Sequence, residues 1–96
     1  MSPLKRKKLN KIRLKLDKLD NSLIKLIKQR TNLVNQVLKL KDKKNEIIDN
    51  KRIKIILKNI KKKSLANKID PKITNRIWKN MIWSYIDYEK RNFKKK

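Results

Sequence analysis

The sequence predicts an all-α protein with three helices. Apolar residues recur every three to four positions along most of the chain, and no stretch alternates apolar and polar residues as a half-buried strand does. Two polar stretches interrupt this pattern, at 42–50 and 64–71. We therefore expect one helical domain over residues 1–96, with helices at about 5–42, 50–63 and 71–93.

The first predicted helix carries the strongest pattern. Ten of its positions follow one another in alternating steps of three and four residues, which is typical of a coiled-coil seam. They are Leu9, Ile12, Leu16, Leu19, Leu23, Leu26, Arg30, Leu33, Val37 and Leu40. A second apolar stripe lies beside the seam, at Ile24, Ile27, Val34 and Leu38. The resulting wide face favours a helical bundle over a two-stranded coil.

The length of this helix indicates that a second chain covers it. A helix of about 38 residues is about 57 Å long. A compact monomer of this size has a radius of gyration of only about 12–13 Å. Two shorter helices of the same chain cannot cover such a length. We therefore expect an intertwined homodimeric bundle, two-fold symmetric, with antiparallel long helices.

The second and third predicted helices begin with recognisable caps. Asp70 precedes Pro71, which combines an N-cap residue with a proline at the first helical position. Asp49 or Asn50 can cap the second helix in the same way. Apolar stripes within these helices can pack on the bundle, at Ile53, Ile56, Leu57 and Ile60 and at Ile73, Ile77, Met81 and Ile82.

The composition excludes several kinds of site. The chain has no Cys and no His, which argues against a zinc site, a disulfide framework and His-dependent nucleophilic catalysis. It has no Gly, so a glycine-rich phosphate loop is excluded. No apolar run is long enough for a transmembrane segment or a secretory signal. We expect a cytoplasmic protein without a bound metal and without membrane association.

The net charge of +23 invites a nucleic-acid interpretation, which the composition weakens. Lys, Ile and Asn supply 50 of the 96 residues, and these residue types share A/T-rich codons. The lysines are spread along the chain, and no zinc finger, bZIP basic region or RNP motif is present. A solvated lysine surface is the simpler interpretation, and it would still attract a small anion.

Charged residues stand at several positions where the helical pattern expects apolar ones. Arg30 lies in the seam and needs an anionic partner, either a ligand or a carboxylate that sets the register. Lys41 follows eleven residues later on nearly the same face, although an ordinary surface lysine fits too. Glu89 continues a stripe of the third helix, where a salt bridge with a lysine is the alternative role. Arg13 reaches the same ligand only from an antiparallel partner, and Arg52 opens the second helix.

Three or four cations and one carboxyl within a bundle indicate a dianionic substrate. Such a set favours a reaction driven by placement and electrostatics rather than by nucleophilic attack.

These residues resemble the all-α chorismate mutases (type II), and the resemblance covers nearly the whole chain. The spacings from Arg13 to Arg30 and from Arg30 to Lys41 carry it, together with the Leu-Asp-x-Leu-Asp pattern of residues 16–20. Further matching segments are Ile12-Arg13, Leu23-Ile24, Gln29-Arg30, Val37, Asp49, Arg52 and Ile69-Asp70-Pro71. The resemblance implies a small helical dimer with two active sites.

The resemblance also implies a reaction and a role for each site residue. The reaction is the Claisen rearrangement of chorismate to prephenate, which is unimolecular, needs no cofactor and serves phenylalanine and tyrosine synthesis in the shikimate pathway. Arg30 and the partner chain's Arg13 would each hold a carboxylate, and Lys41 would donate to the ether oxygen and a carboxylate. Asp49 and Arg52 would shape the site around the ring, with Asp49 near the ring hydroxyl, while Glu89 would donate the second hydrogen bond to the ether oxygen.

The sequence departs from the chorismate mutase pattern at three points, and these indicate a related family with the same fold. Ile53 stands where many members have a Glu, Tyr85 stands where a small Ser is common, and the loop from Lys41 to Arg52 is short. The first two features are similar to the isochorismate pyruvate lyases, which eliminate pyruvate from isochorismate. Tyr85 also fits as core filler with its hydroxyl at the rim.

Glu89 has a consequence for pH dependence. An ionised carboxylate cannot donate a hydrogen bond, so the role implied for Glu89 requires its protonated form. We expect activity to fall as the pH rises and the profile to flatten in Glu89→Gln.

The sequence therefore favours a homodimeric chorismate mutase, with an isochorismate pyruvate lyase as the alternative. The alternative from another class is a non-catalytic basic helical module that binds nucleic acid or protein. The enzyme requires Arg30, Lys41 and the partner's Arg13 to converge on a cavity, whereas the basic module requires a continuous exposed basic face.

Overall fold

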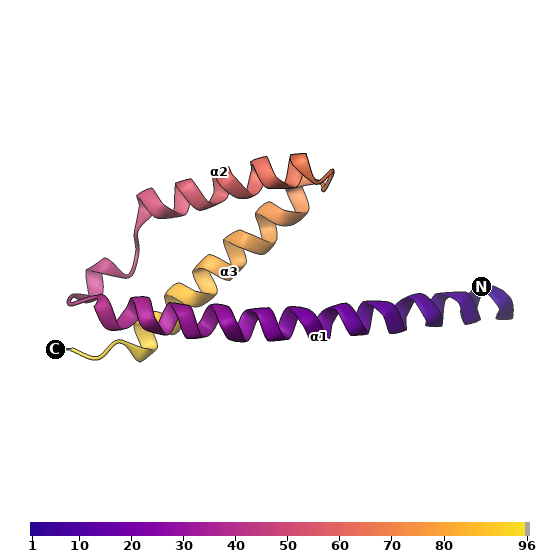
Figure 1. The fold of residues 1–96 in the computed structure, drawn as a ribbon, viewed down its shortest axis with the longest axis horizontal. Coiled ribbons are helices and arrows are strands. Elements are labelled where there is room, and N and C mark those ends of the chain that lie inside the picture. Colours follow the sequence, from indigo (N-terminus) through magenta and orange to yellow (C-terminus); the bar gives the residue numbers. More distant parts are fainter. Residues whose placement is uncertain (96) are drawn as a thin grey trace. The chain divides into compact units, whose positions relative to one another are not determined.

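The computed structural model describes residues 1–95, and within that range the chain contains helices and no strand. The elements are α1 (Pro3–Leu40), the short 3-10 helix η1 (Lys44–Glu46), α2 (Asn50–Ala66) and α3 (Pro71–Asn92) (Figure 1). The all-α class with one long and two shorter helices is thereby confirmed. The intertwined homodimer stays a prediction. In the described part of the chain, no helix combines the length and apolarity needed to cross a bilayer.

Two compact units make up the chain. The first is Met1–Leu33 and the second begins at Val34, so that α1 contributes to both. The prediction of one domain over residues 1–96 stays a prediction.

The first unit is helical almost throughout and leaves its apolar face uncovered. Ser2 starts α1, because its hydroxyl accepts a hydrogen bond from the backbone N–H of Lys5 at 3.2 Å. This cap and Pro3 place the start two residues before the predicted one, and the helix also ends two residues before its predicted end. The seam leucines of this unit, among them Leu16, Leu19 and Leu23, are exposed.

The second unit contains a small hydrophobic core. Leu38 from the end of α1, Ile47 from the loop, and Ile82 and Ile86 from α3 are buried together. Partly buried side chains pack around this core, namely Ile48, Ile53, Ile56, Leu57 and Phe93. Burying one such aliphatic side chain contributes about 1.5–3 kcal/mol, so this core stabilises the ends of α1 and α3 and the loop that joins α1 to α2.

α2 and α3 form a hairpin whose turn differs from the prediction (Figure 1). The sequence places a break at Ser64, but Ser64 is helical and buried, and α2 continues to Ala66. The Ser64 hydroxyl is satisfied inside the hairpin, because it lies 2.6 Å from the carbonyl oxygen of Ile60 and 2.7 Å from the hydroxyl of Thr74. That tertiary contact outweighs the local preference of serine for a turn.

A left-handed residue closes α2, and an aspartate opens α3. The backbone N–H of Ile69 donates to the Ser64 carbonyl at 2.9 Å and that of Lys68 to the Leu65 carbonyl at 3.2 Å, which is a Schellman motif. Lys68 has a φ of 55°, a conformation that glycine adopts most easily. Asp70 then caps α3, because its carboxylate accepts from the backbone N–H of Lys72 at 2.9 Å.

Candidate active site

The second unit holds a largely buried ion pair between Lys41 and Glu89. Lys41 follows the last residue of α1, and Glu89 lies in the last turns of α3. The ammonium nitrogen of Lys41 lies 3.2 Å from Oε1 of Glu89, and the two side chains are only 18% and 8% exposed. An ion pair withdrawn from water is costly unless its hydrogen bonds are satisfied, so its position depends on the groups around it.

The loop after α1 supplies a further hydrogen bond to Lys41. The Lys41 ammonium also donates to the backbone carbonyl of Ile47 at 3.4 Å, and the Ile47 side chain is buried in the core. Glu46 fixes the same loop, because its carboxylate accepts from the backbone N–H groups of Asp42 at 3.2 Å and Lys43 at 2.8 Å. The ammonium group is thus oriented by a loop that the core holds in place.

A shallow hollow of about 490 Å³ lies beside this pair at the start of α2. Lys41 and Asp49 both line it, which brings two of the predicted site residues together. Oδ1 of Asp49 accepts from the backbone N–H of Arg52 at 3.0 Å, so Asp49 is the N-cap of α2. Of the two caps that the sequence allows, Asp49 and Asn50, the structure has Asp49, and a role of Asp49 near a ring hydroxyl stays a prediction. The Arg52 side chain is exposed.

Tyr85 lies half-buried on α3 and takes part in an aromatic pair. Its ring packs edge-to-face against that of Tyr88, with centroids 6.4 Å apart and an angle of 88° between the planes. The Tyr88 hydroxyl in turn donates to Oδ1 of Asn35 at 2.8 Å, which ties α3 to the end of α1. Tyr85 therefore packs against a neighbouring ring, and a role of Tyr85 in binding substrate stays a prediction.

Arg13 and Arg30 belong to the first unit. Arg13 is exposed, and Arg30 is half-buried although seam leucines near it are exposed. The convergence of Arg30 and of a partner's Arg13 on Lys41 stays a prediction. Among residues 1–95, no group of three or more side chains suited to hold a metal ion is found.

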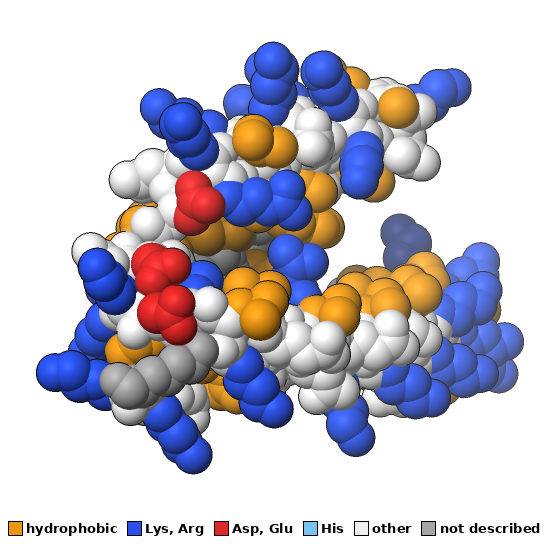
Figure 2. Space-filling model, turned by 60° about the vertical axis from the view of Figure 1, so that its left-hand side comes forward, with side chains coloured by type: hydrophobic (Ala, Val, Ile, Leu, Met, Phe, Trp, Pro, Cys, Tyr) orange, Lys and Arg blue, Asp and Glu red, His pale blue; other side chains and the backbone are white. Residues whose placement is uncertain are grey.

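Basic side chains dominate the surroundings of these groups. On the face shown in Figure 2, Lys and Arg side chains are spread over the surface and acidic ones are few, in keeping with 31 basic and 8 acidic residues. A field of this sign raises the local concentration of an anion at any hollow it surrounds. The Lys41 ammonium, oriented and partly withdrawn from water, can then donate to an oxygen of such an anion.

A comparison with protein families identifies the family of the chain. Residues 12–90 match the model of the chorismate mutase type II family. The chain belongs to that family. The matched range includes every predicted site residue, from Arg13 to Glu89. No curated protein and no solved structure was found to match the chain.

The sequence analysis of this chorismate mutase family member did not predict two groups that position Lys41 and its loop. The Ile47 carbonyl holds Lys41, and the Glu46 carboxylate holds the loop. The signal for the first was an apolar pair, Ile47 and Ile48, inside an otherwise polar turn. The signal for the second was a Glu three residues after Lys43, the spacing at which a helix start is capped.

Proposed function

We propose that the chain is a homodimeric chorismate mutase that converts chorismate to prephenate. The single observation that carries the proposal is the largely buried Lys41–Glu89 pair, which joins the two residues to which the resemblance assigns the ether oxygen. The product would feed phenylalanine and tyrosine synthesis, in the cytoplasm.

The reaction breaks the ether C–O bond and forms a C–C bond within one molecule. Negative charge develops on the ether oxygen as that bond breaks, and the Lys41 ammonium would donate to it there. Arg30 and the partner's Arg13 would hold the two carboxylates, so that the enolpyruvyl arm lies over the ring in the reactive conformation. Arg52 and Asp49 would border the ring at the start of α2.

The Lys41–Glu89 ion pair has to rearrange for this chemistry. Glu89 accepts a hydrogen bond from Lys41 in the structure, whereas the proposed role has Glu89 donate to the ether oxygen. A dianionic substrate would take over the Lys41 hydrogen bond, and Glu89 would carry a proton in the working complex.

The direct test is to follow the loss of chorismate ultraviolet absorbance on adding purified protein, with prephenate and pyruvate assayed in the same tube. We expect prephenate as the product and its loss in Arg30→Ala. Arg6→Ala is a matched control, since Arg6 is an exposed arginine on the same helix outside the matched range. Equal losses in both variants, or turnover that survives Arg30→Ala, would contradict the proposed site.

The alternative substrate is isochorismate, and Ile53 is the residue that favours it. Ile53 packs against the core and offers no hydrogen bond to a ring hydroxyl. Pyruvate released from isochorismate, without prephenate from chorismate, would make the chain an isochorismate pyruvate lyase. Turnover of neither compound would favour the non-catalytic basic module.

A further inference from the structure

One glutamate folds the loop between α1 and α2. A single carboxylate oxygen of Glu46, Oε1, accepts from the backbone N–H of Asp42 at 3.2 Å and from that of Lys43 at 2.8 Å. The N–H of Glu46 in turn donates to the Lys43 carbonyl at 3.1 Å, within η1. A carboxylate is a stronger acceptor than a neutral carbonyl, so these bonds hold the loop more firmly than an ordinary turn would. Glu46 and the two N–H groups form what we call the loop clamp.

The residue after Glu46 carries the carbonyl that holds Lys41. The Ile47 side chain is only 3% exposed and belongs to the core, and the Ile47 carbonyl accepts from the Lys41 ammonium at 3.4 Å. That distance is near the upper limit for a hydrogen bond, so a small displacement of the loop breaks it. The position of the carbonyl therefore depends on the loop clamp on one side and on the buried side chain on the other.

The Lys41 ammonium has one donor more than the chain uses. Among residues 1–95 its acceptors are the Ile47 carbonyl and Oε1 of Glu89, whereas an ammonium has three N–H donors. One donor is thus left for a ligand. Under the proposed function, a dianionic substrate also takes over the hydrogen bond to Glu89. The Ile47 carbonyl is then the protein group that keeps the ammonium in place during turnover.

We propose that Glu46 is a positioning residue for Lys41, acting through the loop clamp and the Ile47 carbonyl. The proposal rests on the proposed function in one respect, namely that Lys41 donates to the substrate. Misplacing such a donor by about 1 Å costs rate rather than affinity, because Arg30 and the partner's Arg13 would still hold the carboxylates.

The negative charge of Glu46 is not itself required for this role. Glu46 lines the hollow that Lys41 and Asp49 also line, but its carboxylate would repel a dianionic ligand there rather than bind it. What the loop needs from residue 46 is an oxygen that accepts two hydrogen bonds. An amide oxygen in the same place should therefore serve as well.

The kinetic test compares Glu46→Ala with Glu46→Gln in the chorismate assay. Glu46→Ala removes both hydrogen bonds, so kcat should fall by about tenfold or more while KM changes by less than about threefold. Glu46→Gln keeps the acceptor oxygen, and its kcat should stay within about threefold of the wild-type value. If Glu46 only stabilised the fold, Glu46→Ala would lower the melting temperature and leave kcat of the folded protein unchanged, which would overturn the proposal.

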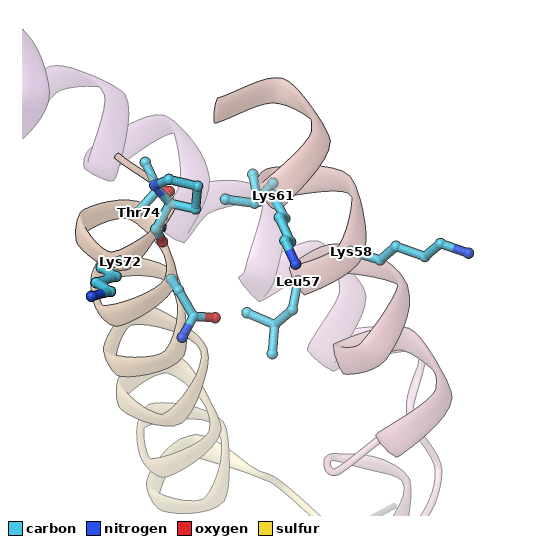
Figure 3. A pocket seen from close by; sticks show the side chains of 8 residues that line it. Leu57, Lys58, Lys61, Lys72 and Thr74 are labelled. Atoms are coloured by element: carbon cyan, nitrogen blue, oxygen red, sulfur yellow. Dashed lines mark hydrogen bonds between the residues drawn. The ribbon is translucent and has the colours of Figure 1, made fainter. Parts of the chain in front are cut away.

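Asp70→Ala is the matched control at the other end of the hairpin. The Asp70 carboxylate likewise accepts from a backbone N–H, that of Lys72, at 2.9 Å. Figure 3 shows the groove of about 520 Å³ at that end, with Lys72 on α3 and Leu57 and Lys61 on α2. None of the predicted site residues lines this groove. Asp70→Ala should lower the melting temperature as Glu46→Ala does, and leave kcat within about twofold of the wild-type value.

A measurement without substrate tests the loop clamp itself. The Lys41 side chain is 18% exposed and its ammonium is hydrogen-bonded, so it should react slowly with acetic anhydride. Mass spectrometry gives the rate of acetylation at each lysine separately. Glu46→Ala should raise the rate at Lys41 by about threefold or more, and Glu46→Gln and Asp70→Ala should not. Lys51 is the internal reference, because it is exposed, lines the same hollow and should react at one rate in all variants.

The two readouts separate failure of this inference from failure of the proposed function. Faster acetylation of Lys41 together with a lower kcat in Glu46→Ala, both restored in Glu46→Gln, would support the positioning role. Faster acetylation in a protein that does not turn over chorismate would support the loop clamp and contradict the proposed function. An unchanged rate at Lys41 in Glu46→Ala, or a loss of kcat as large in Glu46→Gln or Asp70→Ala, would overturn the inference and leave the enzyme assignment intact.

Discussion

The two units of the chain use their apolar residues in opposite ways. In the second unit, Leu38, Ile47, Ile82 and Ile86 come from three separate segments and bury one another. In the first unit, a longer and more regular apolar stripe lies on one helix and remains exposed. The most regular pattern in the sequence thus belongs to the part of the molecule that makes the fewest contacts of its own. We infer that this regularity is a requirement of the partner chain rather than of the protomer.

The largest effect is expected from a charged residue placed in the exposed seam of the first unit. Leu19 lies in the seam and Leu14 lies outside it, yet they are 61% and 62% exposed in the single chain. Because the two leucines are equally exposed in the protomer, burial within one chain predicts that Leu19→Lys and Leu14→Lys have the same small effect on stability and turnover. A seam that packs on a second chain predicts that Leu19→Lys alone abolishes the dimer and all turnover, because it places an unpaired charge in an apolar interface.

Sedimentation velocity and the chorismate assay check this pair of variants. Dimer and activity retained in both variants would show that the seam is not an interface. Loss in both would show that solubility or folding, rather than the seam, is affected.

The second largest effect is expected from Lys41→Met in the second unit. Lys41 is the charged one of the two side chains proposed to donate to the ether oxygen, so its removal should lower kcat by roughly 10²–10³-fold. The variant also leaves Glu89 without its partner, which lowers the free energy of unfolding by about 1–3 kcal/mol. The double variant Lys41→Met with Glu89→Gln separates the two effects, because it removes the buried charge and should recover stability without activity. Recovery of activity in that double variant would show that Lys41 only holds the fold.

A smaller effect concerns the pH dependence set by Glu89. The protonated form is the one that donates, so wild-type kcat should fall as the pH rises, and Glu89→Gln should remain active over the same range. The two profiles should meet at low pH and diverge at high pH. Glu89→Leu is the control, because it has no donor and should be slow at every pH. Parallel profiles of the wild-type protein and Glu89→Gln would contradict the role of the proton.

The smallest effect is expected at the turn between α2 and α3. Lys68 has a φ of 55°, which costs a non-glycine residue about 1 kcal/mol. Lys68→Gly should therefore raise the free energy of unfolding by roughly 0.5–1 kcal/mol. Lys62→Gly, inside α2 four residues before its end, should lower the free energy of unfolding by about the same amount. Urea denaturation of both variants checks the sign, and a loss of stability in Lys68→Gly would contradict the cap.

Local chemistry made much of the fold predictable. The helical period gave the three helices, and the caps at Asp49 and Asp70 are where side-chain chemistry predicts them. The end of α2 was wrong because Ser64 is held by Thr74, a contact between residues ten positions apart that no local rule contains. The Ile47 carbonyl at Lys41 was missed for the same reason, since a backbone group has no signature in the sequence.

The candidate site was predictable to a different degree in each unit. Spacing and charge singled out Lys41 and Glu89, and the structure brings them to 3.2 Å. The same kind of spacing singled out Arg13 and Arg30, whose proposed ligand contacts require a second chain and a bound substrate. A periodic pattern identifies the face that is buried, and it leaves open which molecule buries it.

Subunit complementation tests most directly whether the site is shared between two chains. Arg13→Ala and Lys41→Met would each be purified as inactive dimers and then mixed in equal amounts under conditions in which subunits exchange. Half of the exchanged dimers are mixed, and in each of them one site carries both substitutions while the other carries neither. The account therefore predicts recovery of about a quarter of wild-type turnover. Mixtures that exchange subunits and stay inactive would show that Arg13 and Lys41 act within one chain, and would contradict it.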